Sequence, residues 1–378
     1  MTKQPSYRFA GYTEPWEQKK LGEVAEVNPK SVVPDEFKYV DLGAVVGTEM
    51  VSYRNETIST SPSRAQRLAV KGDVFYQTVR PYQKNNYLFK KDDNDYVFST
   101  GYAQLRPNGD GCFLLSYLQT NKFVNVVLDN CTGTSYPAIN SKDLSDIFIS
   151  IPSLPEQTAI GSFFQDIDQL ISLQQGKLEV LKEQKRAYLK LLFPAKGQTK
   201  PALRFAGFED EWTSVLLGDI SELYQPKTIS SEDLLTEGFP VFGANGYIGY
   251  YRDYNHKENQ VTISARGEGT GTPSFVEGPV WITGNSMVVN VEKQDNITKP
   301  FLYAFCLSFD FKPFVTGGAQ PQLTREVLKK VKIMLPSLPE QESIGSFFQD
   351  LDKAIAKQEE RVNQLKESKQ TLLRKMFI

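Results

Sequence analysis

Residues that can read nucleic-acid bases alternate with aromatic residues in three short runs of this 378-residue chain. The longest run is FYQTVRPYQKNNY, at residues 75–87, and shorter runs occupy Phe242–Tyr247 and Thr262–Gly267. Arginine can pair with the edge of guanine and asparagine or glutamine with that of adenine, whereas lysine and tyrosine suit phosphates. The same residue types also form turns in ordinary loops, so both interpretations stay open. With two later loops included, the candidate DNA-binding residues are Arg80, Tyr82, Gln83, Lys84, Tyr136, Asn140, Asn245, Tyr247, Arg266, Gln320 and Gln322.

The sequence contains no recognisable catalytic constellation. It has no G-x-x-x-x-G-K-[ST] phosphate loop, and the glycine-rich Gly267–Gly271 lacks the spacing of a dinucleotide fingerprint. His256 is the only histidine, in a polar loop where we expect it at the surface, which removes most triad and metal sites. The Glu-x-Lys spacing of some nuclease sites occurs at Glu183–Lys185 and Glu367–Lys369, but in helical sequence that predicts a solvated face. We therefore predict no catalytic residue, no metal ligand and no enzymatic activity of the chain itself.

Two versions of one block, at residues 152–193 and 336–377, organise the rest of the chain. Both contain PSLPEQ and IGSFFQD unchanged, and they align without a gap at an offset of 184. Ser153 and Glu156 are three residues apart, which is the capping-box spacing of a helix start. Pro155 falls in the first turn, where its missing N–H costs nothing. Each block therefore predicts one long helix.

Within both blocks, seam residues recur at alternating steps of four and three, which is the heptad pattern of a coiled coil. One glutamine and one lysine stand at matching seam positions of the two copies. Polar seam residues cost stability but can fix register, so we expect the two helices to be partners, with Gln174 and Gln358 as register marks. An amphipathic helix packed on its own domain is the alternative. The predicted seam includes Ile167, Ile171, Gln174, Leu178 and Leu181 in the first block and Leu351, Ile355, Gln358, Val362 and Leu365 in the second.

A second repeat precedes each helical block. Arg-Phe-Ala-Gly begins at Arg8 and again at Arg204, and a tryptophan and a Leu-Gly pair downstream match at the same offset of 196. The chain is therefore two half-molecules, and the globular parts between the matching ends differ in sequence. We assign a first domain to residues 1–152, a helix to 153–193, a linker to 194–203, a second domain to 204–336 and a second helix to 337–378.

Both globular parts carry mixed strand and helix signals, which predict α/β domains. β-Branched and aromatic runs indicate strands, and longer apolar stretches indicate helices. A short strand is expected just before each long helix, at Ile147–Ile151 and Val331–Leu335. The other expected strands are Tyr39–Val46, Asp73–Val79, Tyr96–Leu105, Phe239–Phe242, Gln260–Ala265, Val280–Thr283 and Met287–Val291, and the expected helices are Cys112–Asp129 and Thr298–Phe309.

Composition narrows the class of protein further. The formal net charge of −2 argues against a strongly basic nucleic-acid binder that works alone. The three scattered cysteines suit a reducing cytosol and offer neither a disulfide framework nor a metal spacing. No leader-like apolar region begins the sequence, and no stretch approaches 18 uninterrupted apolar residues. We expect a cytoplasmic protein that is neither secreted nor membrane-spanning.

Two variable α/β domains, each followed by a repeated long helix, resemble the specificity subunit of a type I restriction–modification system. The resemblance covers essentially the whole chain. It is carried by the PSLPEQ-x-x-IGSFFQD-x-D helix openings, the Leu-Gly-acidic segments near Leu21 and Leu217, and the GDVFYQTVRPY stretch from Gly72. In the second domain FPVFGANGYIGY, ISARGEGTG and GGAQPQLT are similarly typical of that family's target recognition domains.

The resemblance implies a fold and a set of partners. Each target recognition domain would read one half of a split DNA sequence in the major groove, and the helices would form an antiparallel coiled coil, with pseudo-twofold symmetry, that sets the gap. The implied partners are double-stranded DNA, two methyltransferase subunits and two restriction–translocase subunits. S-adenosylmethionine, ATP and Mg²⁺ would belong to those subunits, and this chain would need no cofactor. A non-catalytic coiled-coil scaffold without a DNA role is the alternative, but it gives no reason for variable domains in a shared frame.

Overall fold

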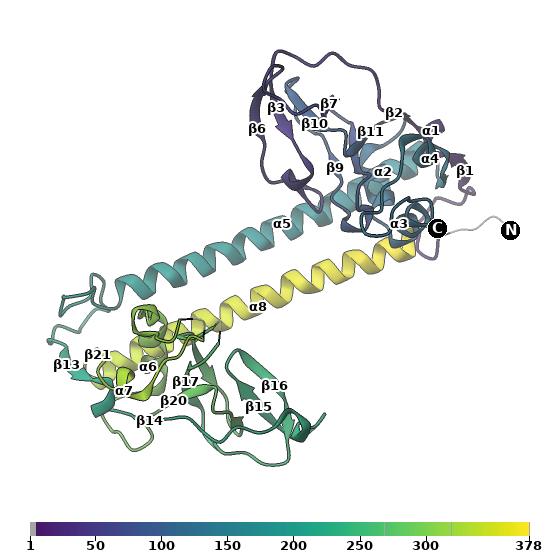
Figure 1. Ribbon diagram of the computed structural model, residues 1–378. Coiled ribbons are helices and arrows are strands. Elements are labelled where there is room, and N and C mark those ends of the chain that lie inside the picture. Colours follow the sequence, from purple (N-terminus) through teal and green to yellow (C-terminus); the bar gives the residue numbers. More distant parts are fainter. Residues whose placement is uncertain (1–4, 268, 319, 378) are drawn as a thin grey trace. The chain divides into compact units, whose positions relative to one another are not determined.

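The computed structural model describes residues 5–267, 269–318 and 320–377. The chain divides into two compact units: unit 1 is Met1–Gln175 with Glu360–Ile378, and unit 2 is Gly176–Glu359. Each unit combines one sheet-rich α/β domain with one segment from each of two long helices, α5 (Leu154–Leu191) and α8 (Leu338–Met376) (Figure 1).

Unit 1 is built around a four-stranded antiparallel sheet. Its strands, in spatial order, are β2 (Ala25–Val27), β11 (Tyr102–Pro107), β8 (Val74–Gln77) and β9 (Tyr87–Leu88). Successive side chains of a strand point to opposite faces, so Val74 and Tyr76 of β8 enter one core while Phe75 enters another. Because both faces are covered, all four residues of β8 are buried. This strand is therefore a rigid base for the loop that follows it.

A second, mixed sheet of unit 1 packs on the Phe75 face. Phe75 stacks on Phe98 of the second sheet with ring centroids 3.6 Å apart. The strands of this sheet, in spatial order, are β6 (Arg54–Thr57), β3 (Glu36–Val40), β10 (Tyr96–Ser99) and β7 (Ala65–Leu68), and β3 and β10 are parallel. Two-stranded pairs are formed by β1 (Glu17–Lys20) with β12 (Phe148–Ile151), and by β4 (Val45–Val46) with β5 (Glu49–Met50).

The other face of the central sheet in unit 1 is covered by helices. The helices of this domain are α1 (Leu21–Val24), α2 (Gly111–Leu118), α3 (Asn121–Asp129) and α4 (Ser141–Asp146). Phe113 of α2 and Phe123 of α3 share a core with Tyr76 of β8. Phe164 of α5 and Phe377, just after α8, belong to the same core, and their ring centroids are 5.7 Å apart. The domain is thereby fixed to both helix segments of its own unit.

Unit 2 repeats this plan with a different sequence. Its main sheet contains β14 (Glu222–Tyr224), β20 (Ser286–Asn290), β17 (Gln260–Ser264) and β18 (Pro273–Val276), in the same antiparallel order of elements. Its other strands are β16 (Gly246–Tyr251), β15 (Phe239–Gly243) and β19 (Trp281–Ile282) in one sheet, and β13 (Thr213–Leu216) with β21 (Lys332–Leu335) in another. The helices are α6 (Lys299–Ser308) and α7 (Arg325–Leu328). Phe301 of α6, Phe193 after α5 and Phe348 of α8 share one core.

The segments of α5 and α8 pair antiparallel inside each unit. In unit 1, Asp168 of α5 forms an ion pair with Lys369 of α8. In unit 2, Lys185 of α5 pairs with Asp352 of α8 at 2.5 Å. The two pairs are related by the 184-residue repeat, so the seam lysines pair with the last aspartate of the repeated helix opening. The predicted solvated face is therefore wrong for these lysines, which are 13% and 18% exposed. All predicted seam residues are buried or half-buried.

A buried ion pair fixes the start of each long helix. Arg8 donates from Nε and Nη2 to both carboxylate oxygens of Glu156, at 2.6 and 2.7 Å. Arg204 makes the same two bonds to Glu340, at the same distances. The helix starts are confirmed at Leu154 and Leu338. Instead of closing a capping box, the glutamate of each block binds the arginine of the Arg-Phe-Ala-Gly repeat.

Several strand predictions are confirmed to within one or two residues, but three predicted elements are divided. Tyr96–Leu105 is two strands, β10 and β11, because a turn at Thr100–Gly101 takes the chain from one sheet to the other. Cys112–Asp129 is two helices, because the Thr120 hydroxyl accepts a hydrogen bond from the Phe123 N–H and caps a new helix. Tyr39–Val46 is likewise interrupted by a 3₁₀ turn, η1 (Leu42–Ala44).

Candidate nucleic-acid interface

Two loops of unit 1 lie side by side at the end of the central strand. Residues 78–84 directly follow β8 and form the β8 loop, and residues 132–138 form the brace loop of unit 1. A β-bridge joins Val79 to Ala138. Ala138 also exchanges two backbone hydrogen bonds with Thr132, at 2.9 and 3.0 Å. The buried strand on one side and the closed brace loop on the other hold the β8 loop in place.

Arg80 is held in place by both its backbone and its side chain. Its backbone is left-handed, with φ +54°, a conformation that costs a non-glycine residue about 1 kcal/mol. Its N–H donates to the carbonyl oxygen of Pro137 at 2.8 Å, and its guanidinium carbon lies 4.3 Å from the ring centroid of Tyr136. An arginine against an aromatic face keeps its N–H edge available for pairing in the plane. Tyr136 is 63% exposed, so the pair stands at the surface.

Two buried amide side chains, those of Gln77 and Asn86, hold the β8 loop in place. Gln77 donates from Nε2 to the carbonyl oxygen of Val79 (2.7 Å) and to Oε1 of Gln83 (2.8 Å). Asn86 accepts the backbone N–H of Gln77 at 2.8 Å. The Gln77 side chain therefore holds both sides of the turn that carries Arg80. Amide side chains can do this because they offer two donors and an acceptor in one plane.

Lys84 closes the β8 loop against the helices of unit 1. Its ammonium donates to the carbonyl oxygen of Gln119 at 2.9 Å and to Oδ1 of Asn121 at 2.5 Å. Burial lowers the pKa of Lys84 below its ordinary value. Its charge is thus turned toward the protein, between α2 and α3.

Unit 2 has the same arrangement at the end of β17. The β17 loop spans residues 265–271, and the brace loop of unit 2 spans 316–322; Glu268 and Ala319 lie outside the described residues. Arg266 forms a β-bridge with Gln322, and Gln322 exchanges two hydrogen bonds with Thr316, at 2.8 and 2.9 Å. The bonding matches that of unit 1, where Val79 and Ala138 occupy the corresponding positions.

Glycine is required at the turn of both brace loops. Gly133 has φ +85°, and a Cβ there would lie 3.1 Å from the carbonyl oxygen of Tyr136. Gly317 has φ +98°, and its Cβ would lie 2.4 Å from the carbonyl oxygen of Gln320. Only glycine adopts such a turn without strain. The same backbone therefore presents tyrosine in one unit and glutamine in the other.

The β15–β16 hairpin of unit 2 reaches the β17 loop. A Cβ on Gly269 would lie 2.3 Å from Oδ1 of Asn245, so glycine permits a close approach between the hairpin turn and the loop. Tyr247 lies just beyond the turn, 57% exposed, with its ring edge on Phe242 at a centroid distance of 5.3 Å. The β17 loop is also bound to its brace loop by Thr270, whose hydroxyl is 3.2 Å from the carbonyl oxygen of Pro321.

A family model described as the type I restriction modification DNA specificity domain matches the chain twice, at residues 13–183 and 209–367. The chain belongs to this family. The resemblance drawn from the sequence motifs is therefore confirmed, and each match ends inside one of the long helices.

Relatives of the DNA specificity family bear names that agree with this assignment. The type I restriction enzyme MjaVIII specificity subunit of Methanocaldococcus jannaschii is 22% identical over 64% of this chain and 64% of its own length. The putative MjaX specificity subunit of the same organism is 23% identical over 95% of this chain and 92% of its own. Both relatives are named as specificity subunits, which agrees with the family expected from the sequence motifs.

Solved structures show the same fold. The S subunit of a type I restriction–modification system from M. genitalium covers the whole of this chain, with 99% of that chain covered, 18% identity and a TM-score of 0.67. A chain from a structural study of assembly and conformational transition of a type I system matches 98% of this chain and 99% of that chain, at 23% identity and a TM-score of 0.59.

The candidate residues divide between exposed and structural positions. The structure brings Arg80 together with Tyr136, and Arg266 with Gln322. Asn140 serves as the N-cap of α4, where its Oδ1 accepts the N–H groups of residues 142 and 143. Tyr82, Gln83, Asn245, Tyr247 and Gln320 are exposed.

Gln77 and Asn86 were not among the candidates. Both lie in the polar run that identified the β8 loop, but nothing in their spacing distinguishes a buried supporting amide from an exposed one.

The prediction that His256 lies at the surface is wrong, because its side chain is buried. Its Nδ1 is 2.6 Å from Oδ1 of Asn255, and its Nε2 is 2.8 Å from the hydroxyl of Tyr224. Burial lowers the pKa of His256 below its ordinary value of 6.5. A histidine held on both ring nitrogens inside a fold stabilises its loop and presents no free nitrogen to a substrate.

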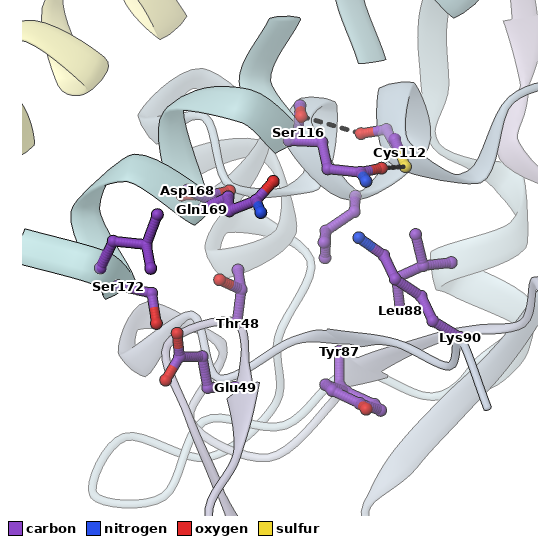
Figure 2. Close-up of a pocket in the computed structure, with 13 residues that line it drawn as sticks. Thr48, Glu49, Tyr87, Leu88, Lys90, Cys112, Ser116, Asp168, Gln169 and Ser172 are labelled. Carbon is purple, nitrogen blue, oxygen red and sulfur yellow. Dashed lines mark hydrogen bonds between the residues drawn. The ribbon is translucent and has the colours of Figure 1, made fainter. Parts of the chain in front are cut away.

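A cavity of about 370 Å³ in unit 1 carries no recognisable chemistry. Figure 2 shows Cys112 and Ser116 of α2 on one side and Asp168 and Ser172 of α5 on another. The Cys112 thiol donates to Oε1 of Gln165, 2.9 Å away, and burial raises its pKa. A thiol with a raised pKa is a poor nucleophile.

Within residues 5–267, 269–318 and 320–377, no group of three or more His, Cys, Asp or Glu side chains could hold a metal ion. In the same part of the chain, no helix combines the length and apolar character needed to cross a membrane.

Proposed function

We propose that the chain reads a bipartite DNA target, one half-site with each unit, and directs the other subunits of a type I restriction–modification complex to it. The observation that carries the proposal is the repeated frame. In both units a buried central strand ends in a loop that is bridged to a glycine-containing brace loop. The side chains on that frame differ between the units, as expected when two readers recognise different sequences. A scaffold without a DNA role would not need one frame with two sets of polar side chains.

We propose specific roles for the candidate side chains. Arg80 in unit 1 and Arg266 in unit 2 would pair with guanine or with a phosphate, because Arg80 lies on the ring face of the exposed Tyr136 and Arg266 is itself exposed. Asn245 and Gln322 would read adenine edges, and Tyr136 would orient Arg80. Further DNA contacts would come from four side chains that are exposed, namely Tyr82, Gln83, Tyr247 and Gln320. Lys84 and Asn140 form hydrogen bonds within the protein, which supports a structural role for both side chains.

The proposed partners follow from the family. Two methyltransferase subunits would supply S-adenosylmethionine and the transfer chemistry, and two restriction subunits would supply ATP- and Mg²⁺-dependent activity, in the cytoplasm. The formal charge of −2 means that acidic side chains outnumber basic ones, so this chain has no excess of cations for phosphates. The isolated chain should therefore bind DNA weakly and gain affinity when the methyltransferase subunits are present.

We also propose the divisions of the chain and the role of its helices. Residues 1–152 and 204–336 would be the target recognition domains, and 194–203 a linker between the halves. The helices at 153–193 and 337–378 would set the number of base pairs between half-sites, with Gln174 and Gln358 helping to fix their register.

Half-site-specific loss of recognition tests the proposal. The complex with its methyltransferase partners is assayed on duplexes that carry the mapped target, and on duplexes with one half-site scrambled. Arg80→Ala should impair only recognition of the first half-site and Arg266→Ala only that of the second, each by about 1–3 kcal/mol. Arg186→Ala is the matched control, since this exposed guanidinium on α5 already lies 3.8 Å from a Glu183 carboxylate oxygen. Equal loss at both halves, or no loss, would contradict the assignment.

A further inference from the structure

Ile248 occupies a β-bulge at the end of the β15–β16 hairpin. Phe242 pairs with Tyr247, and the next pair along the hairpin is Val241 with Gly249. Ile248 is therefore the extra residue of β16, with no partner opposite it on β15. Bulges of this kind redirect a side chain away from the regular alternation of a strand.

The redirected side chain is exposed although it is aliphatic. Ile248 is 52% exposed. A Cβ added to Gly243 would lie 3.1 Å from Cγ2 of Ile248, so the Ile248 side chain packs against the backbone of the hairpin. Tyr247, the residue before it, leans on the buried Phe242 and thus has a packing role as well. Among the described residues of unit 2, Ile248 belongs to neither hydrophobic core, so core packing does not account for its apolar side chain.

The polar residues around this hairpin end are of the kinds that hydrogen-bond to bases. Asn245 is in the same turn and closely approaches Gly269 of the β17 loop, the loop that begins with Ala265 and Arg266. An amide and a guanidinium distinguish bases by their donors and acceptors. One feature of a base edge in the major groove is apolar, namely the C5-methyl group of thymine.

We propose that Ile248 contacts the C5-methyl group of a thymine in the half-site read by unit 2. This inference rests on the proposed function and adds to it one specificity-determining residue and the base that it recognises. Covering one methyl group with an aliphatic side chain should strengthen binding about fourfold, the equivalent of one buried methylene.

The test replaces thymine by deoxyuridine, which keeps the base pair and removes only the methyl group. In the complex with the methyltransferase subunits, each thymine of the second half-site is replaced singly and the Kd is measured for every duplex. With the unaltered chain, one replacement should weaken binding about fourfold. With Ile248→Ala, binding to the thymine duplex should weaken by a similar factor, and the same replacement should have no further effect. Ile248→Val, which keeps both γ-carbons and removes only the δ-methyl group, should retain most of the thymine preference.

Val180→Ala is the matched control, because Val180 is an aliphatic residue of α5 with the same exposure of 52%. It should leave the thymine preference intact. The inference is overturned if no thymine occurs in that half-site, if no replacement weakens binding, or if the weakening persists in Ile248→Ala. Equal loss on all duplexes would instead place Ile248 against a partner subunit. Failure of the unaltered complex to prefer any bipartite duplex would refute the proposed function itself, and so is distinguishable from these results.

Discussion

Removing Arg204 should loosen the start of α8 more than any surface change on that helix. Glu340 is only 1% exposed, and its carboxylate accepts two bonds from Arg204 and a third from Nε1 of Trp212, 3.2 Å away. Arg204→Met keeps much of the side-chain volume but leaves the carboxylate buried without its cation. Breaking a buried pair in this way costs about 3–5 kcal/mol, because the remaining charge is unpaired.

The two partners should differ in their individual cost. Arg204 is 17% exposed, so after Glu340→Met its guanidinium can turn toward water, and the loss should be smaller than for Arg204→Met. In the double variant Arg204→Met with Glu340→Met no charge remains buried. Replacing a buried pair by apolar groups of similar volume is often close to neutral, so the double variant should lie within about 2 kcal/mol of the unaltered chain.

Hydrogen exchange in increasing urea, read by mass spectrometry, gives the opening free energy of the amides at residues 338–348. Lys353→Met is the control. Both side chains of the Lys353–Asp350 ion pair are exposed, so removing the lysine should not change the opening free energy of these amides measurably. A cost below about 1 kcal/mol for Arg204→Met, or a double variant that loses the sum of the single losses, would refute this account of the pair.

The remaining predictions concern the seam, the buried histidine and the helix length. Lys185→Glu should destabilise the helix segments of unit 2, and adding Asp352→Lys should restore them, as measured by hydrogen exchange; no restoration would show that the pair is incidental. Because burial lowers the pKa of His256, the unfolded chain takes up a proton below about pH 6.5 that the folded chain resists. The unfolding free energy of unit 2 should therefore be full above that pH and fall as the pH drops toward the folded-state pKa, and His256→Gln should abolish this slope. Inserting one heptad into each long helix should widen the recognised gap by about 3 bp, since seven residues add about 10.5 Å and DNA rises about 3.4 Å per base pair; a methylated motif with its gap unchanged would exclude the spacer role.

The long helices could be predicted because their signals are local and repeated. A heptad pattern and a proline in the first turn depend on neighbours within a few positions, so the starts at Leu154 and Leu338 follow from the sequence. The partners of Glu156 and Glu340 could not be predicted in the same way. Arg8 lies 148 residues from Glu156 along the chain, and only the fold brings them together. Arg8 and Glu156 both lie in repeated segments, but their spacing along the chain does not indicate that they form an ion pair.

The candidate site was located only in part for the same reason. The polar run at residues 75–87 correctly marked the β8 loop, because strand-end loops carry turn and hydrogen-bonding residues. It did not separate Gln77, which is buried and supports the loop, from Arg80, which lies at the surface against Tyr136. His256 was misplaced because a polar loop sequence gave no sign of its two buried partners, Asn255 and Tyr224.

Methylome sequencing of a host that carries the chain with its methyltransferase subunits tests the central claim most directly. The account predicts one bipartite motif with a fixed gap, methylated throughout the genome. It also predicts that Arg266→Ala relaxes one half of that motif and leaves the other half and the gap unchanged. A contiguous motif, or a variant that alters both halves together, would contradict the claim that each unit reads its own half-site.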